Sequence, residues 1–182
     1  MAGEEAPGAL EHVRVFVNTR DVEGGIDELD NPGALAKFLR GRGLVPHGTA
    51  ATGSDLAVAR ELREALRALL VHNAGAPLAP EALHALDHIA ADFKMKPRFS
   101  AHSVALDPEV SGARAGLGGL LAIVAHAMGD GTWPRLKACL RDSCRWAFYD
   151  HARNRTGRWC SMAVCGNRTK AERYRARHPR GE

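Results

Sequence analysis

The stretch CLRDSCRWAFYDHARNRTGRWCSMAVC, residues 139–165, contains all four cysteines of the 182-residue chain. Cys139 and Cys144 form one pair, and Cys160 and Cys165 form a second pair with the same four-residue gap. Two close pairs of thiolates, separated by a loop of moderate length, suit a tetrahedral zinc site with four cysteine ligands. Two disulfides or four unrelated buried thiols are the alternatives, and disulfides require an oxidising compartment.

Electric charge divides the chain near residue 132. Residues 1–132 contain 12 Lys and Arg against 17 Asp and Glu, a net charge of −5, whereas residues 133–182 contain 13 against 4, a net charge of +9. Six of the ten aromatic residues also follow residue 132. We therefore predict two domains: an acidic domain over residues 1–132, and a basic unit over residues 133–182 that has its own aromatic core and binds a polyanion.

The N-terminal residues MAGEEAPGAL suggest a frayed tail and lack the basic and apolar regions of a signal peptide. The longest apolar run, residues 117–128, contains glycines and His126 and is too short and too polar to cross a bilayer. We therefore expect a cytoplasmic protein that does not have the membrane as a partner.

Residues 1–132 predict a helix-rich α+β domain with a small antiparallel sheet. Strands are expected over residues 12–17, ending near Asn18, and over residues 99–106. Helices are expected over residues 32–41, 54–74, 80–92 and 111–128. The expected N-caps are Asn31, Ser54 and Ser111, and Gly129 is expected to end the last helix. The glycines at 112, 116, 118 and 119 lack the spacing of a phosphate-binding loop and are expected to allow close packing at the start of the last helix.

Most charged side chains of this domain are expected to be solvated. The arginines at positions 60, 63 and 67 lie opposite the apolar face of their helix. His84, His88 and Asp92 share one helical face without the H-E-x-x-H pattern of a metal site. Residues 21–30 read as a flexible acidic loop, whereas His126 is expected in the core. No nucleotide-binding loop, dinucleotide fingerprint or nucleophile elbow occurs here, so we expect no enzymatic activity.

The C-terminal unit is expected to contain a knuckle, a hairpin and a helix. Residues 150–157 suggest the hairpin tip, and the residues after Cys165 read as a basic helix that ends at Pro179. A helix N-terminus at Cys165 would favour its thiolate form.

Two segments of the chain resemble known families. Residues 158–162 (RWCSM) and 165–170 (CGNRTK), together with Cys139, Cys144 and residues 146–150, resemble the CGNR zinc finger over about residues 133–177. Residues 15–20 (VFVNTR) and the helix that follows resemble the ABATE domain, which precedes this finger. The resemblance implies a stress-linked bacterial transcription regulator with a treble-clef DNA-binding finger. It also implies zinc on Cys139, Cys144, Cys160 and Cys165.

In such a finger, zinc fixes a segment that is too small to fold alone, and basic side chains bind duplex DNA. Phosphate contacts would supply the affinity, and one or two arginines could read guanine edges. Asn167 could contact adenine, although capping the helix is its expected role. The candidate DNA-binding residues are Arg153, Arg155, Arg158, Asn167, Arg168, Lys170, Arg173, Arg175 and Arg177.

Other functions and partners stay open. A metal-dependent nuclease could use His151 and Asn154 of the hairpin loop, and a zinc module could bind protein or RNA instead of DNA. One finger covers a small footprint, so specific binding requires a homodimer or a second contact. The N-terminal domain is the expected place for a small-molecule effector or for a dimer interface.

Overall fold

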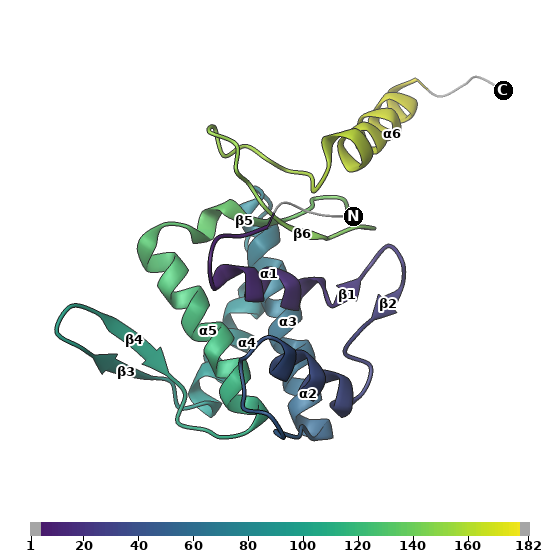
Figure 1. The fold of residues 1–182 in the computed structure, drawn as a ribbon. Helices are drawn as coiled ribbons and strands as arrows, with labels where there is room; N and C mark the ends of the chain where they lie inside the picture. The colour runs from purple at the N-terminus through teal and green to yellow at the C-terminus, as the bar shows by residue number, and fades with distance from the viewer. Residues whose placement is uncertain (1–4, 179–182) are drawn as a thin grey trace.

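The computed structural model describes residues 5–178, and helices dominate it (Figure 1). The helices are α1 Leu10–Asn18, α2 Pro32–Gly41, α3 Gly53–Asn73, α4 Pro80–Asp92, α5 Ala113–Asp130 and α6 Asn167–Arg177. The strands form three antiparallel pairs: β1 Arg20–Asp21 with β2 Ile26–Asp27, β3 Lys96–Phe99 with β4 Val104–Asp107, and β5 Leu136–Ala138 with β6 Ala147–Tyr149. The predicted α+β class is confirmed.

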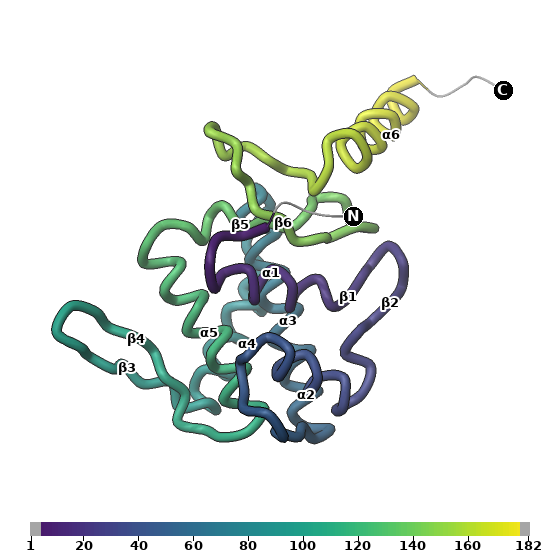
Figure 2. The backbone as a smooth tube through the Cα atoms, viewed as in Figure 1, coloured from purple at the N-terminus to yellow at the C-terminus, as the bar shows by residue number. Residues whose placement is uncertain are grey.

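Helix α3 is the centre of the fold. It contacts α1, α2, α4 and α5 as well as strand β5, as the tube in Figure 2 shows. Its apolar stripe includes Leu62, Leu66 and Leu70, which are fully buried. The helix begins one residue earlier than predicted, because Thr52 rather than Ser54 is its N-cap. Thr52 Oγ1 accepts the Asp55 N–H at 3.2 Å and the Asp55 carboxylate accepts the Thr52 N–H at 2.9 Å, which makes a capping box.

Residues 12–17 form part of helix α1, so the predicted strand is wrong. Leu10, Val13 and Val17 recur at intervals of three and four residues, and all three side chains are buried against the core. Six residues are too few to distinguish the two-residue repeat of a strand from the 3.6-residue repeat of a helix. The helical repeat becomes visible only when Leu10 is included. Helix α2 follows the prediction, with the Asn31 side chain accepting the Ala34 N–H at 3.0 Å.

Residues 99–106 contain a chain reversal instead of one strand. The turn at Ser100–Ser103 separates β3 from β4, and the Ser100 N–H donates to the Ser103 carbonyl at 2.9 Å. This hairpin projects from the body of the molecule (Figure 1). Phe99 and Val104 face each other across it and are 82% and 56% exposed.

Helix α5 confirms the close-packing role for two of the four glycines but not the predicted caps. A Cβ at Gly112 or Gly119 would meet no atom of the described residues within 4 Å, so the prediction is wrong for these two. A Cβ at Gly116 would lie 2.7 Å from Val45, and one at Gly118 would lie 2.6 Å from Pro108. The helix runs through Gly129 and ends at Gly131, which has a left-handed φ of 77°. No side-chain cap is made at its start, so Ser111 does not have the predicted role. His126 is 80% exposed and lies 3.7 Å from Asp130, outside the core.

The main core continues past residue 132. Leu136, Ala138 and Ala147 of the β5–β6 hairpin are fully buried in the same cluster as the leucines of α3. The Asn73 amide at the end of α3 donates to the Leu136 carbonyl at 2.9 Å. The hairpin that carries Cys139 and Cys144 is therefore built directly on the N-terminal part, and the domain division at residue 132 stays a prediction.

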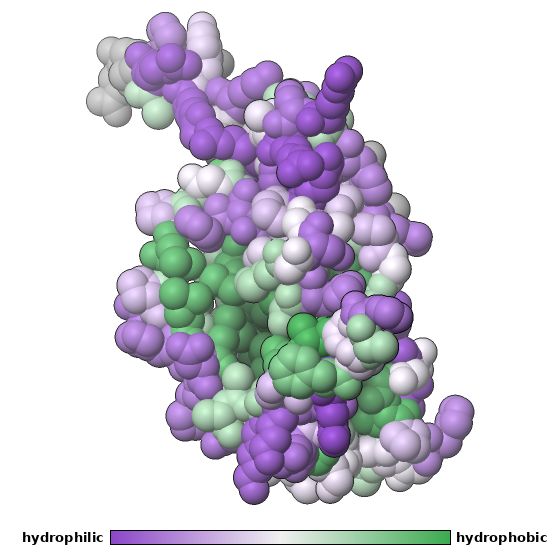
Figure 3. Space-filling model, turned by 90° about the vertical axis from the view of Figure 1, so that its left-hand side faces the viewer, coloured by the Kyte–Doolittle hydropathy of each residue, from purple (hydrophilic) through white to green (hydrophobic). Residues whose placement is uncertain are grey.

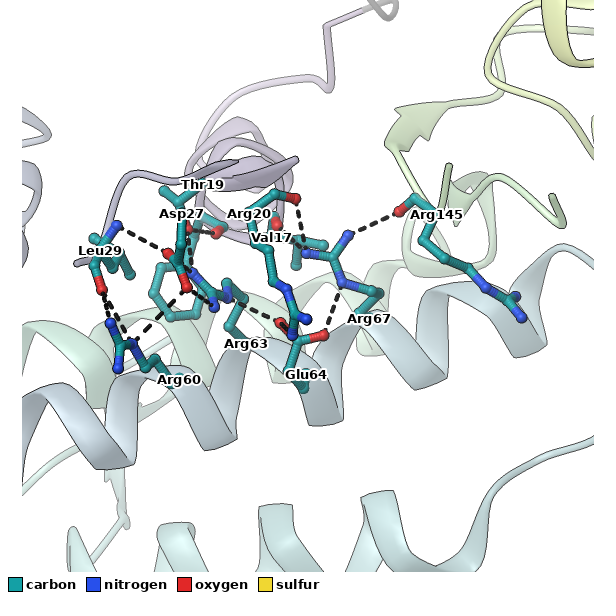
Figure 4. A network of polar contacts seen from close by, with 11 residues as sticks. Val17, Thr19, Arg20, Asp27, Leu29, Arg60, Arg63, Glu64, Arg67 and Arg145 are labelled. Carbon is teal, nitrogen blue, oxygen red and sulfur yellow. Dashed lines mark hydrogen bonds and ion pairs between the residues drawn. The ribbon is translucent and has the colours of Figure 1, made fainter. Parts of the chain in front are cut away.

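Two arginines of α3 are buried, which contradicts the predicted solvated face. The side chains of Arg63 and Arg67 are 1% and 6% exposed, and both point toward α1 and the β1–β2 hairpin (Figure 4). Arg63 donates to the two oxygens of Asp27 at 2.6 and 2.7 Å and to Thr19 Oγ1 at 3.1 Å. These hydrogen bonds lower the pKa of Asp27. The acidic loop, residues 21–30, is thus anchored at Asp27 rather than flexible.

Arg67 connects three segments of the chain. Its guanidinium donates to the carbonyl of Val17 at the end of α1 at 2.6 Å and to that of Arg20 in β1 at 3.2 Å. It also donates to the Arg145 carbonyl at 2.8 Å, in the segment between Cys144 and β6. Glu64, one turn earlier on α3, accepts from Nε at 3.0 Å and balances the charge.

A hollow of about 990 Å³ lies between α5, β4 and the start of α1. Small and apolar residues line it, among them Gly8, Leu10, Leu106, Ile123 and Ala127. Figure 3 shows apolar side chains gathered in a depression on this face of the molecule.

Across residues 5–178, every helix is too short or too polar to traverse a lipid bilayer.

We predict that Arg63→Met destabilises the protein by about 3 kcal/mol, because the substitution leaves Asp27 without its buried partner. Arg98→Met is the matched control, since Arg98 and Asp107 form an exposed ion pair at 3.2 Å whose loss should cost less than about 1 kcal/mol. Urea unfolding followed by circular dichroism measures both. Equal losses for the two variants would contradict the structural role of Arg63.

Candidate metal centre and nucleic-acid interface

The four cysteines meet at one point. Their sulfur atoms all lie within 4.8 Å of one another, with Cys144 to Cys160 at 3.6 Å and Cys160 to Cys165 at 3.7 Å. A disulfide bond would need about 2.05 Å, so these thiols are not paired. Zinc–sulfur bonds of about 2.3 Å at tetrahedral angles place sulfur atoms about 3.8 Å apart. The arrangement therefore fits one zinc ion bound by Cys139, Cys144, Cys160 and Cys165.

Two local structures position these ligands. Cys139 and Cys144 lie in the loop of the β5–β6 hairpin, where the Cys139 N–H donates to the Trp146 carbonyl and the Cys144 N–H to the Arg141 carbonyl, both at 2.9 Å. Cys165 lies in a single π-helical turn, Met162–Gly166, which leads into α6. The Ser161 hydroxyl caps this turn by accepting the Val164 N–H at 3.3 Å. The knuckle precedes the basic helix, as the prediction of a treble clef requires.

The predicted hairpin is shifted along the sequence. The strands pair on either side of the Cys139–Cys144 knuckle, with Ala138 opposite Ala147, whereas residues 150–157 form an irregular loop. After this loop the chain runs back beside the knuckle, where the Leu140 N–H donates to the Arg158 carbonyl at 3.0 Å. The basic helix after Cys165 is confirmed as α6, and Pro179 lies outside the described residues.

The thiols influence one another strongly. Hydrogen bonds from Cys144 and Cys160 lower the pKa of Cys139 to about 2, and the hydrogen bond to Cys139 raises the pKa of Cys144 to about 12. The pKa of Cys165 is raised by burial and by the charge of Cys139, so the predicted effect of the helix N-terminus does not dominate. Four thiolates this close repel one another, and a divalent cation removes that repulsion.

Four of the aromatic residues after position 132 divide between two clusters. Trp146 and Trp159 pack around the cysteines, whereas Trp133 and Tyr149 are part of the main core. The finger therefore has only a small aromatic core of its own.

A buried ion pair organises the loop over residues 150–157. Lys137 and Asp150 are 4% and 5% exposed, and Lys137 Nζ lies 2.7 Å from Asp150 Oδ2. Lys137 also donates to the Arg155 carbonyl at 2.6 Å, and Asp150 accepts the Gly157 N–H at 2.8 Å. A Cβ at Gly157 would lie 2.8 Å from Asp150 Oδ2, so only glycine fits at that position. This pair has no signal in the sequence, because neither side chain belongs to a recognisable motif.

The candidate DNA-binding residues are exposed at the end of the molecule that carries the finger. Figure 1 shows the loop over residues 150–157 and helix α6 on either side of the β5–β6 hairpin. No side chain of α6 is buried. The exposed candidates in the loop and its return are Arg153, Arg155 and Arg158, and those on α6 are Asn167, Arg168, Lys170, Arg173, Arg175 and Arg177.

Asn167 and Arg168 both make contacts that the sequence analysis did not predict. The Asn167 amide donates to the Ala163 carbonyl at 3.2 Å, so it does not cap the helix N-terminus; Ser161 caps the preceding turn. Arg168 Nη1 lies 2.6 Å from Glu23 Oε1, which belongs to the β1–β2 loop of the N-terminal part.

Two ion pairs fix the orientation of α6. Arg141 in the knuckle lies 2.9 Å from Glu172 on α6, and Arg168 pairs with Glu23. Cys165 anchors the turn that leads into the helix. The helix is therefore positioned by the metal site and by charge, not by apolar packing.

We predict one zinc ion per chain, measured by plasma mass spectrometry of the purified protein. A chelator should remove it and change the fluorescence of Trp146 and Trp159, while the far-ultraviolet signal of α1–α5 is largely kept. Cys160→Ser should weaken zinc binding at least roughly tenfold, whereas Ser143→Ala, beside Cys144, should not. A zinc content that Cys160→Ser leaves unchanged would refute the four-ligand site.

We predict that Lys137→Met destabilises the finger by about 3 kcal/mol, because it leaves the Asp150 carboxylate buried without its partner. Hydrogen exchange at Ala152 and Gly157 should accelerate, since both N–H groups donate to Asp150. Lys170→Met on exposed α6 is the control and should change stability by less than about 0.5 kcal/mol. Unaltered exchange in Lys137→Met would show that the loop is held by other contacts.

Two family models match the chain. The ABATE model, described as "Putative stress-induced transcription regulator", matches residues 13–130, and the CGNR zinc finger model matches residues 135–178. Among curated proteins no relative matches. The ABATE match extends from α1 to the end of α5, and the CGNR match contains all four clustered cysteines. The chain belongs to the ABATE family of transcription regulators and carries a C-terminal CGNR zinc finger.

Proposed function

We propose that the protein is a transcription regulator that binds duplex DNA through its zinc finger. The observation that carries the proposal is helix α6, whose side chains are all unburied and which extends away from the body of the molecule (Figure 1). Within residues 5–178, Arg168 is the basic residue of α6 that forms an ion pair, whereas Arg175 and Arg177 donate to backbone carbonyls of the same helix. Phosphate groups are the natural partner of such a helix.

The zinc ion is structural in this proposal, and the finger's own residues carry the function. Arg173, Arg175 and Arg177 lie on the outer turns of α6 and would contact phosphate groups along a groove. Arg153 and Arg155 lie in the loop that the Lys137–Asp150 pair organises, so they would meet the backbone at a second place. These two sets of arginines would supply the affinity for DNA. One or two arginines in the major groove would contact base edges and supply the specificity.

The alternative of a nuclease has less support. His151 Nε2 lies 2.9 Å from the Glu5 carbonyl, and its ring packs on Tyr149, so this histidine has a structural role. Asn154 Oδ1 accepts the Thr156 N–H within the same loop. The families named above are regulatory rather than enzymatic. We therefore propose binding without catalysis, in the cytoplasm, where thiols stay reduced.

An effector and a homodimer stay proposals for the N-terminal part. The hollow beside α5 is large enough for a small apolar molecule, because ligand sites typically enclose about 300–1,000 Å³. A homodimer would double the small footprint of one finger.

We predict that the zinc-loaded protein binds random-sequence duplex DNA, measured by fluorescence anisotropy, and that affinity falls steeply between about 50 and 200 mM salt. Arg173→Gln and Arg175→Gln should each weaken binding to all sequences alike and reduce the salt slope by about 0.9. Arg98→Gln removes the same charge from the exposed β3–β4 hairpin and serves as the control.

Three results would contradict the proposal. The first is that Cys160→Ser binds duplex DNA as well as the natural chain does. The second is that RNA or a protein competes better than duplex DNA. The third is that plasmid DNA is cleaved in the presence of Mg²⁺ or Mn²⁺. Selection from a pool of random duplexes then identifies the preferred site.

A further inference from the structure

The ion pair between Glu23 and Arg168 joins residues 145 positions apart in the sequence. Glu23 lies in the loop between β1 and β2, and Arg168 lies in the first turn of α6 within the CGNR motif. Arg168 Nη1 is 2.6 Å from Glu23 Oε1, and the two side chains are 52% and 35% exposed. Among the described residues, this is the ion pair that connects α6 to the chain before residue 132. A proposed DNA-contacting arginine is thus neutralised by the N-terminal part.

The β1–β2 loop is placed against the finger by a rigid base. The Gly24 N–H donates to Asp21 Oδ1 at 2.9 Å, and Gly25 has a left-handed φ of 68°, which closes the turn tightly. Asp21, Glu23 and Gly24 border a hollow of about 270 Å³ whose other side is formed by Cys144 and Trp146. The loop therefore lies beside the metal centre as well as beside α6.

The base of this loop belongs to the buried arginine network. Asp27 of β2 is bound by Arg63, and the Arg20 carbonyl of β1 accepts from Arg67 (Figure 4). The same Arg67 binds the Arg145 carbonyl beside the knuckle. A shift of α3 relative to α1 would move these contacts, and the position of Glu23 would change with them.

We infer that Glu23 is a built-in competitor of DNA: its carboxylate occupies Arg168 in the free protein and must give way to a DNA phosphate. The inference rests on the proposed DNA-binding function and adds a means by which the N-terminal part controls it. A carboxylate and a phosphate oxygen both accept charge-assisted hydrogen bonds from a guanidinium, and the contact with Glu23 neutralises the charge of Arg168 that would otherwise attract a phosphate.

Glu23→Gln tests the inference directly. In anisotropy measurements at low salt, this variant should bind duplex DNA about two- to fivefold more tightly than the natural chain, the range expected of one exposed ion pair. The gain should shrink as salt is raised. Glu28→Gln is the matched control: it removes the same charge from the residue that follows β2, and among residues 5–178 the Glu28 carboxylate has no ion-pair partner. Its effect should be clearly smaller.

A double-variant cycle separates a specific contact from a general change in charge. In the Arg168→Gln background, Glu23→Gln should no longer change the affinity, because its partner is absent. A gain of equal size in that background, or equal affinities for Glu23→Gln and Glu28→Gln, would overturn the inference while leaving DNA binding intact. If neither the natural chain nor Glu23→Gln binds duplex DNA, the proposed function fails and the inference fails with it. Binding by Glu23→Gln alone would support both.

Discussion

The structure depends on one buried cation, the guanidinium of Arg67. A charge removed from water needs a hydrogen-bond acceptor for nearly every N–H group, because unpaired donors in a protein interior are costly. Arg67 finds acceptors at the end of α1, at β1 and beside the zinc knuckle, with Glu64 as its counter-ion. Because one guanidinium binds all of these acceptors, the end of α1, strand β1 and the knuckle are held at defined positions around α3. Asn18 adds to the arrangement, since its side chain accepts the Ala147 N–H at 2.7 Å and donates to the Ala147 carbonyl at 2.9 Å.

The two parts of the finger are held in place by different kinds of interaction. The β5–β6 hairpin is held by apolar burial and by hydrogen bonds to α1 and α3, so it belongs mechanically to the N-terminal core. Helix α6 has no buried side chain and depends on Cys165, Glu172 and Arg168 for its position. Apolar contacts tolerate salt, whereas exposed ion pairs weaken with it. Helix α6 is thus attached by the interactions that are easiest to alter.

Much of the fold follows from hydrophobic periodicity. The observed boundaries of α2, α3 and α4 lie within about two residues of the predicted ones. Each of these helices has a single apolar stripe and a recognisable start or stop. The prediction was wrong for α1, where six alternating residues fit either period, and for β3–β4, where a turn of serines carries no strong signal. It was also wrong for Arg63 and Arg67. Their positions opposite the leucines indicate a polar face, but no local pattern tells whether that face meets water or another segment.

The family, the four cysteines of the metal centre and the basic character of the C-terminal end follow from the sequence alone. Each of these rests on residue type and spacing, which do not depend on the path of the chain. The positions of the charged side chains, in contrast, follow from the tertiary fold. Burial of Arg63 and Arg67, the Lys137–Asp150 pair and the Glu23–Arg168 contact all join residues distant in sequence. An ion pair requires proximity within a few ångströms, and that proximity arises from packing around α3 rather than from any local preference of the residues involved.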